Sequence, residues 1–525
     1  MWRRARQRWQ HLLIALGAIA LLPSASAGNT DGTLRVSLTS DIRSTNPGVN
    51  RDANTDTVMM HVLEGLVAYR EDGSTGPLLA ESIELSTDAT EYTFRLRPQV
   101  RFHNGTSLTS DDVVWSWQRY LDPATGWSCL SDFDGSRGHR IESVTAVAPD
   151  TVVFKLNRPQ PMFLSQMAAI QCGGGAILHR SSLNPDGSWN APVATGPYVL
   201  ETWKRGQYID LRAFSGYRSR SGPRDGNTGG KIAHASHVRW LIIRDSAARL
   251  AALVKGQVDV MPEVPAAETV QLRRMPGITL IAKPMLVNYA ILIQDQAAPL
   301  GDVRIRRALA LSLDRTAIAA LVTNDVGVAN PSVIPSSSPY HSRQHFSGGS
   351  YDVSQARALL AQAGYRGEPI VLTTNRRYPA MFNQALLVQA MARQAGINLQ
   401  LEVLEWATQL DRWKSGKYQL MSFGFTARAD PYLNYDAMLG DRSRSHTKLW
   451  DNPVALELQR AAGESSDPQT RQQLFERMHE LMVADCPLIV LYSLSDVNAV
   501  RSGVSGFDSW VFGRARLWGV RPSSS

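Results

Sequence analysis

Alternating and helical apolar patterns follow one another along most of this 525-residue chain. In residues 91–105, apolar and polar side chains alternate, and the closing pair Asn104-Gly105 predicts a hairpin turn. Residues 109–121 then place apolar side chains on one helical face, behind a Thr/Ser cap and an acidic first turn. Pro123 predicts the end of that helix, so a hairpin leads directly into a helix here.

The second half carries a strand, a helix and a strand with short connections. Residues 368–375 form a short apolar run, and residues 383–396 have helical periodicity that ends at Gly396, a residue suited to the left-handed cap. Residues 397–406 alternate again. This order predicts parallel strands in an α/β fold.

The N-terminal segment has the three parts of a secretory signal. A basic stretch precedes a short apolar run, and Ala25-Ser26-Ala27 supplies a small-x-small cleavage site. The first cysteine is Cys129, so a lipid anchor at the mature N-terminus is excluded, and no later segment reaches 18 uninterrupted apolar residues. We therefore predict a signal peptide over residues 1–27 and a soluble, exported protein.

Charge adds little once the signal is removed. Four of the 55 basic residues and none of the 47 acidic residues lie in residues 1–27, so the formal charge falls from +8 to +4. Basic residues form no stripe with interleaved aromatics, which disfavours a nucleic-acid partner.

Three cysteines are present, and the predicted compartment is oxidising. Cys129 and Cys172 lie in loop-like, glycine-flanked stretches, whereas Cys486 lies in an apolar run and is expected to be a buried free thiol. We expect a Cys129–Cys172 disulfide, although the sequence alone leaves other pairings open.

Catalytic signatures are absent from the sequence. There is no Gly-x-Ser-x-Gly elbow, His479-Glu480 lacks the second histidine of a zinc-protease helix, and Gly173–Gly175 lack the Lys-Ser/Thr of a phosphate loop. His341 and His345 are expected in a solvated loop, as are His234 and His237. We therefore expect no metal and no cofactor, and an enzyme such as a periplasmic peptidase is the disfavoured alternative.

The order of several motifs resembles a known family. Residues 76–123, "GPLLAESIELSTDATEYTFRLRPQVRFHNGTSLTSDDVVWSWQRYLDP", resemble the signature region of extracellular solute-binding proteins of the peptide/nickel/opine class (family 5), the capture subunits of ABC importers. The resemblance continues through "ATGPYVLETWKRGQYIDL" (194–211) and "RLAALVKGQVDVMPEV" (249–264), and covers about residues 33–500.

The resemblance implies a two-lobed α/β flytrap, the large type of periplasmic-binding-protein fold. Residues 28–283 and 493–525 would form lobe I, with a subdomain inserted at about 76–199, and residues 284–492 would form lobe II. It further implies a periplasmic monomer that captures peptides between its lobes and delivers them to ABC permease subunits. An anionic opine or sugar-phosphate conjugate is the alternative ligand, and a metal chelate is a weaker one.

The family's peptide-binding members commonly place an aspartate for the ligand's α-ammonium where this chain has Arg428, with Asp430 two residues later. Arg428 in the cleft would favour a carboxylate or phosphate, whereas Asp430 in that role would favour an ordinary peptide. A third interpretation is that Arg428 pairs with Asp430 or Asp436 and only fixes the loop.

Further ligand-binding candidates come from both predicted lobes, and each has a purely structural alternative in the core, a turn or the hinge. The segment Ser40–Asn46 follows the first strand, where open α/β sheets bind ligands. The candidates are Phe425, Tyr432, Trp406, Ser40, Asn46 and Tyr289, with backbone groups of Cys172 and Gly173.

Overall fold

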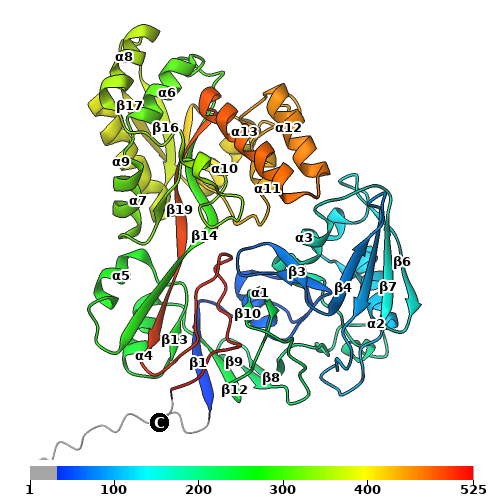
Figure 1. The fold of residues 1–525 in the computed structure, drawn as a ribbon. Helices are drawn as coiled ribbons and strands as arrows, with labels where there is room; N and C mark the ends of the chain where they lie inside the picture. Colours follow the sequence, from blue (N-terminus) through cyan, green and yellow to red (C-terminus); the bar gives the residue numbers. More distant parts are fainter. Residues whose placement is uncertain (1–31, 524–525) are drawn as a thin grey trace, which may run out of the picture.

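Two lobes make up the computed structural model, which describes residues 32–523 (Figure 1). The predicted signal peptide and its cleavage site lie outside the described residues. One lobe carries α6 to α13 and the other carries the chain's first strand together with its last segment, as Figure 1 shows. Within residues 32–523, no helix combines the length and apolarity needed to cross a membrane.

Lobe I contains one half of an 11-stranded sheet, in the order β13-β1-β12-β9-β8. The central strand β1 pairs in parallel with β12 and β13, so their carboxyl ends meet at one edge. Leu34 and Val36, which share one face of β1, are fully buried, as expected for a face packed on the core of the lobe. The strands are β1 (Thr33–Leu38), β8 (Tyr198–Lys204), β9 (Tyr208–Ala213), β12 (His237–Ile242) and β13 (Val260–Met261), and the helices are α1 (Ala53–Met59), α4 (Ser246–Val254) and α5 (Ala266–Leu272).

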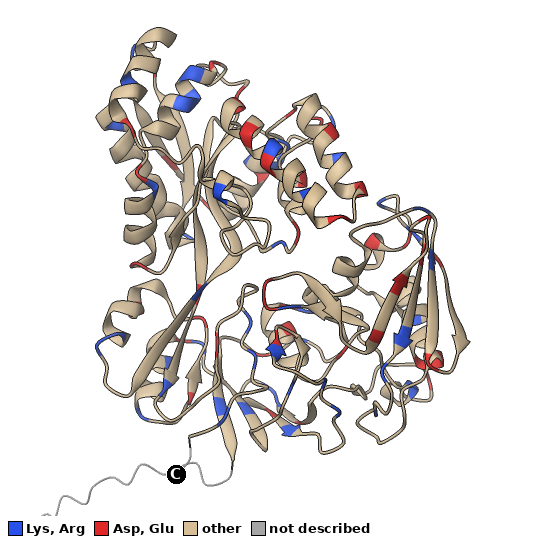
Figure 2. Ribbon diagram, viewed as in Figure 1, with Lys and Arg blue, Asp and Glu red and all other residues tan. Residues whose placement is uncertain are grey.

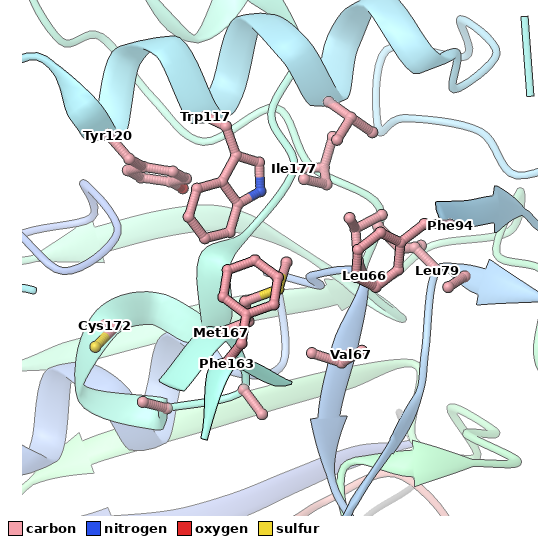
Figure 3. Close-up of a cluster of buried hydrophobic side chains, with 14 of the residues drawn as sticks. Leu66, Val67, Leu79, Phe94, Trp117, Tyr120, Phe163, Met167, Cys172 and Ile177 are labelled. Carbon is pink, nitrogen blue, oxygen red and sulfur yellow. The ribbon is translucent and has the colours of Figure 1, made fainter. Parts of the chain in front are cut away.

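A second, antiparallel sheet in the order β4-β5-β7-β6 flanks lobe I and packs against α2. Its core gathers aromatic side chains, with Trp117 of α2 pointing toward Met167 and Tyr120 lying beside Trp117 (Figure 3). The elements are β4 (Ala80–Leu85), β5 (Glu91–Leu96), β6 (Ile141–Ala148), β7 (Thr151–Leu156), α2 (Ser110–Leu121) and α3 (Phe163–Met167), with hairpins β2 (Val67–Tyr69) to β3 (Thr75–Pro77) and β10 (Arg224–Asp225) to β11 (Thr228–Gly229).

Cysteine pairing agrees with the sequence prediction. A disulfide joins Cys129 to Cys172 across 43 positions, and it lies at the edge of this aromatic core. Cys486 is a buried free cysteine in lobe II, as predicted.

The hairpin predicted at Asn104-Gly105 is only partly present. Strand β5 ends at Leu96. Beyond it, a bridge between Arg101 and Ser107 and backbone hydrogen bonds from Phe102 to Thr106 and from Leu108 to Val100 join the two arms of the turn. Pro98 follows the strand and has no N–H to donate, which explains why the ladder stops there. The helix predicted next is present as α2, with a capping box between Thr109 and Asp112.

Lobe II contains the other half of the large sheet, in the order β17-β16-β18-β14-β19. Strands β16 and β17 are parallel and α9 connects them, ending at the left-handed Gly396, as the sequence predicted. The elements are α6 (Val303–Leu311), α7 (Arg315–Thr323), β15 (Val328–Ala329), α8 (Val353–Ala363), β16 (Ile370–Asn375), α9 (Pro379–Ala395), β17 (Leu399–Leu404), α10 (Trp406–Ser415), β18 (Leu420–Gly424), α11 (Pro431–Asp436), α12 (Pro453–Glu464) and α13 (Pro468–Asp485).

Two long antiparallel strands, β14 (Ile278–Ile293) and β19 (Leu488–Arg501), run through both lobes (Figure 1). Their pairing is regular from Ile278 to Pro284, and its register then shifts twice, between Pro284 and Asn288 and between Tyr289 and Ala290. An irregular ladder of this kind interrupts strand pairing locally and bends the strands. The sequence placed the lobe limits at 283/284 and 492/493, and these limits stay predictions.

Candidate functional site

The segment between β18 and α11 carries Arg428 and follows the crossing strand β14. The backbone N–H of Phe425 donates to the Asn288 carbonyl at 2.9 Å, and that of Arg428 donates to the Leu286 carbonyl at 3.3 Å. These two hydrogen bonds hold the segment beside the irregular β14–β19 pairing, where the two lobes join.

Asp430 is committed to an internal ion pair. Its two carboxylate oxygens accept from Arg471 of α13 at 2.6 and 2.9 Å, and both side chains are close to nine-tenths buried. Oδ1 also accepts from the Tyr432 N–H, so Asp430 caps α11 as well. Sequence reasoning did not find Arg471, which lies 41 positions away and carries no local signal.

Arg428 has no acidic partner within ion-pairing distance in residues 32–523. Its one side-chain hydrogen bond runs from Nη1 to the Thr426 carbonyl at 3.3 Å, and its guanidinium lies 5.8 Å from the Phe425 ring centroid. Burial lowers the pKa of Arg428, and the distant Asp436 only partly opposes this. Asp436 instead pairs with Lys448. Neither of the acids proposed to fix Arg428 is therefore its partner.

Three aromatic candidates of lobe II, Phe425, Trp406 and Tyr289, lie near the Arg428 segment, in two neighbouring clusters. Phe423 packs against Phe425 and Trp406, with ring centroids 5.6 and 6.2 Å apart respectively. Tyr289 stacks on Tyr492 of the crossing strand β19 at 5.2 Å. These rings lie next to the Arg428 segment. Tyr432 lies apart from them and packs against Gly463 of α12.

The lobe I candidates surround the carboxyl end of β1. Ser40 binds the Asn54 side chain at 2.6 Å, and Asn46 accepts from Arg119 at 2.8 Å. Asn46 and Gly173 line an enclosed cavity of about 30 Å³, the share of liquid volume that one water occupies. Cys172 is 1% exposed, and its carbonyl accepts from Trp127, so it contributes to the framework of this lobe.

The two lobes touch at the Arg428 segment. Ala429 packs against the aromatic core of lobe I and its neighbours, a cluster that includes Trp510 and Phe512. Burial raises the pKa of Tyr69, in the β2–β3 hairpin, to about 12, and the negative charge of Asp430 adds to that rise. The Arg428 segment of lobe II therefore lies against lobe I.

An ion-pair network includes Lys283 of β14, the residue before the irregular β14–β19 pairing. Lys283 donates to Glu71 at 3.0 Å and to Asp508 at 2.9 Å, and Arg516 donates to both carboxylate oxygens of Glu71. Burial opposes ionisation of Glu71, but hydrogen bonds and charge from Arg516 and Lys283 outweigh it and lower its pKa to about 2. This network joins the crossing strand to the C-terminal segment.

The prediction that His345 lies in a solvated loop is wrong. Its side chain is fully buried between His341 and His479, with ring centroids 5.4 and 5.1 Å away. The loop folds back onto α13, a tertiary contact that its polar composition did not indicate. Within the described residues, only Cys129, Asp132 and Cys172 gather three possible metal-ligand atoms, and the disulfide occupies both sulfurs.

Two α/β lobes joined by long crossing strands, with an uncompensated cation at their junction, define a two-lobed binding protein of the flytrap class. The family model for bacterial extracellular solute-binding proteins, family 5 Middle, matches residues 75–445. The chain therefore belongs to this family. It is 30% identical to Di/tripeptide-binding protein 4 of Pseudomonas aeruginosa (strain UCBPP-PA14), over 87% of this chain and 88% of that protein.

Further relatives support the same assignment. The Dipeptide-binding protein of Escherichia coli (strain K12) is 26% identical, over 82% of this chain and 83% of that protein. The solved structure of HbpA2 from Haemophilus parasuis has a TM-score of 0.82 at 23% identity, covering 94% of this chain and 100% of that one. AgaA from A. tumefaciens R10, solved with agropinic acid, has a TM-score of 0.68 at 25% identity, covering 94% and 99%.

Proposed function

We propose that this protein is the periplasmic capture subunit of an ABC importer for short peptides. Family membership supports a binding role, and two relatives are named for dipeptides and tripeptides. Residues 1–27 would direct export and then be removed. The protein would act as a monomer, bind stoichiometrically without turnover, and hand its ligand to permease subunits in the inner membrane.

The observation that carries the proposal is the uncompensated Arg428 at the lobe junction. A half-buried guanidinium without an acid is poorly solvated, and a ligand carboxylate would supply the missing charge with two parallel hydrogen bonds. Asp430 already satisfies Arg471, so it has little capacity left for a ligand ammonium. We infer that the anionic end of the peptide, its C-terminal carboxylate or an acidic side chain, faces Arg428.

Recognition would be coupled to closure of the lobes. A ligand that contacts both lobes stabilises the closed form by its extra affinity for that form. Strands β14 and β19 would bend at the irregular pairing between Pro284 and Asn288. The aromatic group formed by Trp406, Phe425 and Tyr289 would provide apolar walls.

Arg428 also favours a second candidate ligand, a small anionic conjugate such as an opine. AgaA was solved with agropinic acid and shares the fold over 94% of this chain. In this case the ligand would be one discrete acid, whereas peptide import predicts a mixture of short sequences.

Native mass spectrometry of the mature protein, purified from a periplasm, tests both candidates. A ladder of adducts that fragment as short peptides is expected, and Arg428→Ala should remove most of it. The matched control is Arg444→Ala, which removes an exposed arginine of the same lobe that pairs with Asp441. One discrete acidic adduct would favour the conjugate, and adducts that Arg428→Ala leaves unchanged would refute the role given to Arg428.

A further inference from the structure

A second cavity lies in lobe II, between α6, α8, the end of α13 and the start of β19. Its volume is about 400 Å³, within the range of small-molecule sites in proteins. Its lining includes residues 488–490 of β19 and none of residues 423–432. The cavity is therefore separate from the Arg428 segment.

Two arginines line this cavity, and neither has an acidic partner in residues 32–523. Arg315, the first residue of α7, is 6% exposed, and its Nε donates to the Val490 carbonyl at 2.9 Å. Its Nη1 makes a long contact of 3.4 Å with the Ala310 carbonyl, and its Nη2 has no hydrogen bond within the described chain. Arg307 of α6 is exposed at the rim.

Burial lowers the pKa of Arg315 to about 10, which still leaves the guanidinium charged at neutral pH. Burial also raises the pKa of Cys486, in the same cavity, to about 11, so the thiol stays neutral and supplies no counter-charge. A buried charge with only carbonyl partners is costly, and an anion would relieve that cost.

The remaining lining combines aliphatic side chains with polar groups, among them Ser350 and Gln355. Met482, Leu488 and Val490 are almost fully buried, and Leu311 and Leu359 are half-buried on the opposite helices. The aliphatic part of the lining gains from contact with an apolar chain. A cavity that holds two arginines without acidic partners beside aliphatic side chains matches a molecule with one acidic head and an apolar tail.

We propose that this cavity of lobe II is a second binding site, for an aliphatic monocarboxylate held by Arg315 and Arg307. The carboxylate accepts from the free Nη2 of Arg315, and the alkyl chain lies along Met482, Leu488 and Leu359. The site is independent of peptide capture between the lobes.

Isothermal titration of the full mature protein with decanoate tests the proposal, with decanol as the neutral probe of matched length. We expect saturable binding of one decanoate per chain, and binding of decanol weaker by about tenfold or more, because the carboxylate supplies the charge-assisted bond. N-acetylleucine forms a second arm and separates an amino-acid derivative from a fatty acid. Tighter binding of N-acetylleucine would assign the site to the former.

Four variants make the assay specific. Arg307→Gln should weaken decanoate by about three- to tenfold, whereas Arg304→Gln on the same helix, which removes an exposed arginine paired with Asp302, should leave it unchanged. Leu359→Trp fills the cavity without altering charge and should abolish binding. Arg428→Ala should leave decanoate binding unchanged, so the proposals for this site and for the peptide site are tested independently.

No saturable binding to the wild-type protein would overturn the proposal. Equal binding of decanol and decanoate would also overturn it, as would equal effects of Arg307→Gln and Arg304→Gln.

Discussion

Asp496 on β19 is a buried carboxylic acid, and replacing it with asparagine should stabilise the protein. The side chain is 5% exposed and lines a polar cavity of about 10 Å³ together with Ser37, Glu263 and Asn498. Burial, assisted by the charge of Glu263, raises its pKa to about 6, although Asn498 and the Trp510 N–H donate to Oδ2.

The magnitude follows from the two pKa values. A carboxyl with a pKa of 3.8 in the unfolded chain and about 6 in the fold costs about 3 kcal/mol of stability when ionised. Because the folded pKa is raised, the cost is absent below pH 4, grows as pH rises through 6, and is complete above pH 7. Asp496→Asn removes the charge, keeps an acceptor for Asn498, and adds an N–H₂ donor beside this residue, whose own Oδ1 has no hydrogen-bond partner.

Urea unfolding, followed by fluorescence at pH 8 and pH 4, measures the effect. We expect the free energy of unfolding of Asp496→Asn to exceed that of the wild type by up to about 3 kcal/mol at pH 8. At pH 4 the two unfolding curves should converge. Asp508→Asn is the matched control, since Asp508 is exposed and bound to Lys283. It should give no gain at pH 8. A gain for Asp496→Asn that is equal at both pH values, or a loss at pH 8, would refute the argument.

Three further predictions concern stability. Replacing Cys129 and Cys172 with alanine should cost up to about 4 kcal/mol, the loop-closure value for 43 residues, and a reductant should then affect only the wild type in urea unfolding. Arg471→Met should cost about 3–5 kcal/mol in the same assay because it leaves Asp430 buried and unpaired, and Asp430→Asn should recover most of the loss. Glu71→Gln should cost about 1–3 kcal/mol at pH 7, discounted because the side chain is one-third exposed. Since the folded pKa of Glu71 is lowered, this difference should disappear as pH falls from about 4.5 to 2.

Helix positions were predictable because their signals are local. The Thr109 capping box and the Gly396 cap lie within a few positions of the helices that they start or end. The hairpin beyond Leu96 is only partly present because alternation alone ignores the missing N–H of Pro98. Short-range chemistry thus explains both the successes and this failure.

The sequence predicted where the candidate site lies but not which residues pair within it. Its position relative to the family's motifs indicated that residues 425–432 lie near the lobe junction, and the hydrogen bonds to β14 hold them there. The partner of Asp430 comes from α13, 41 positions away, and no pattern in the sequence links the two residues. The burial of His345 was not predictable either, because the composition of its loop does not indicate contact with the distant helix α13.

The pairing of Asp430 changes what the neighbouring arginine does. Had Asp430 been free, the segment would offer one acid and one base to a ligand, and a zwitterionic peptide end would satisfy both. Arg471 instead neutralises Asp430, so the segment presents the net positive charge of Arg428 to the junction. A ligand ammonium placed there would meet a like charge in a poorly hydrated site, and this repulsion would strongly disfavour its binding. The proposed preference for an anionic end of the ligand therefore rests on Arg471 as much as on Arg428.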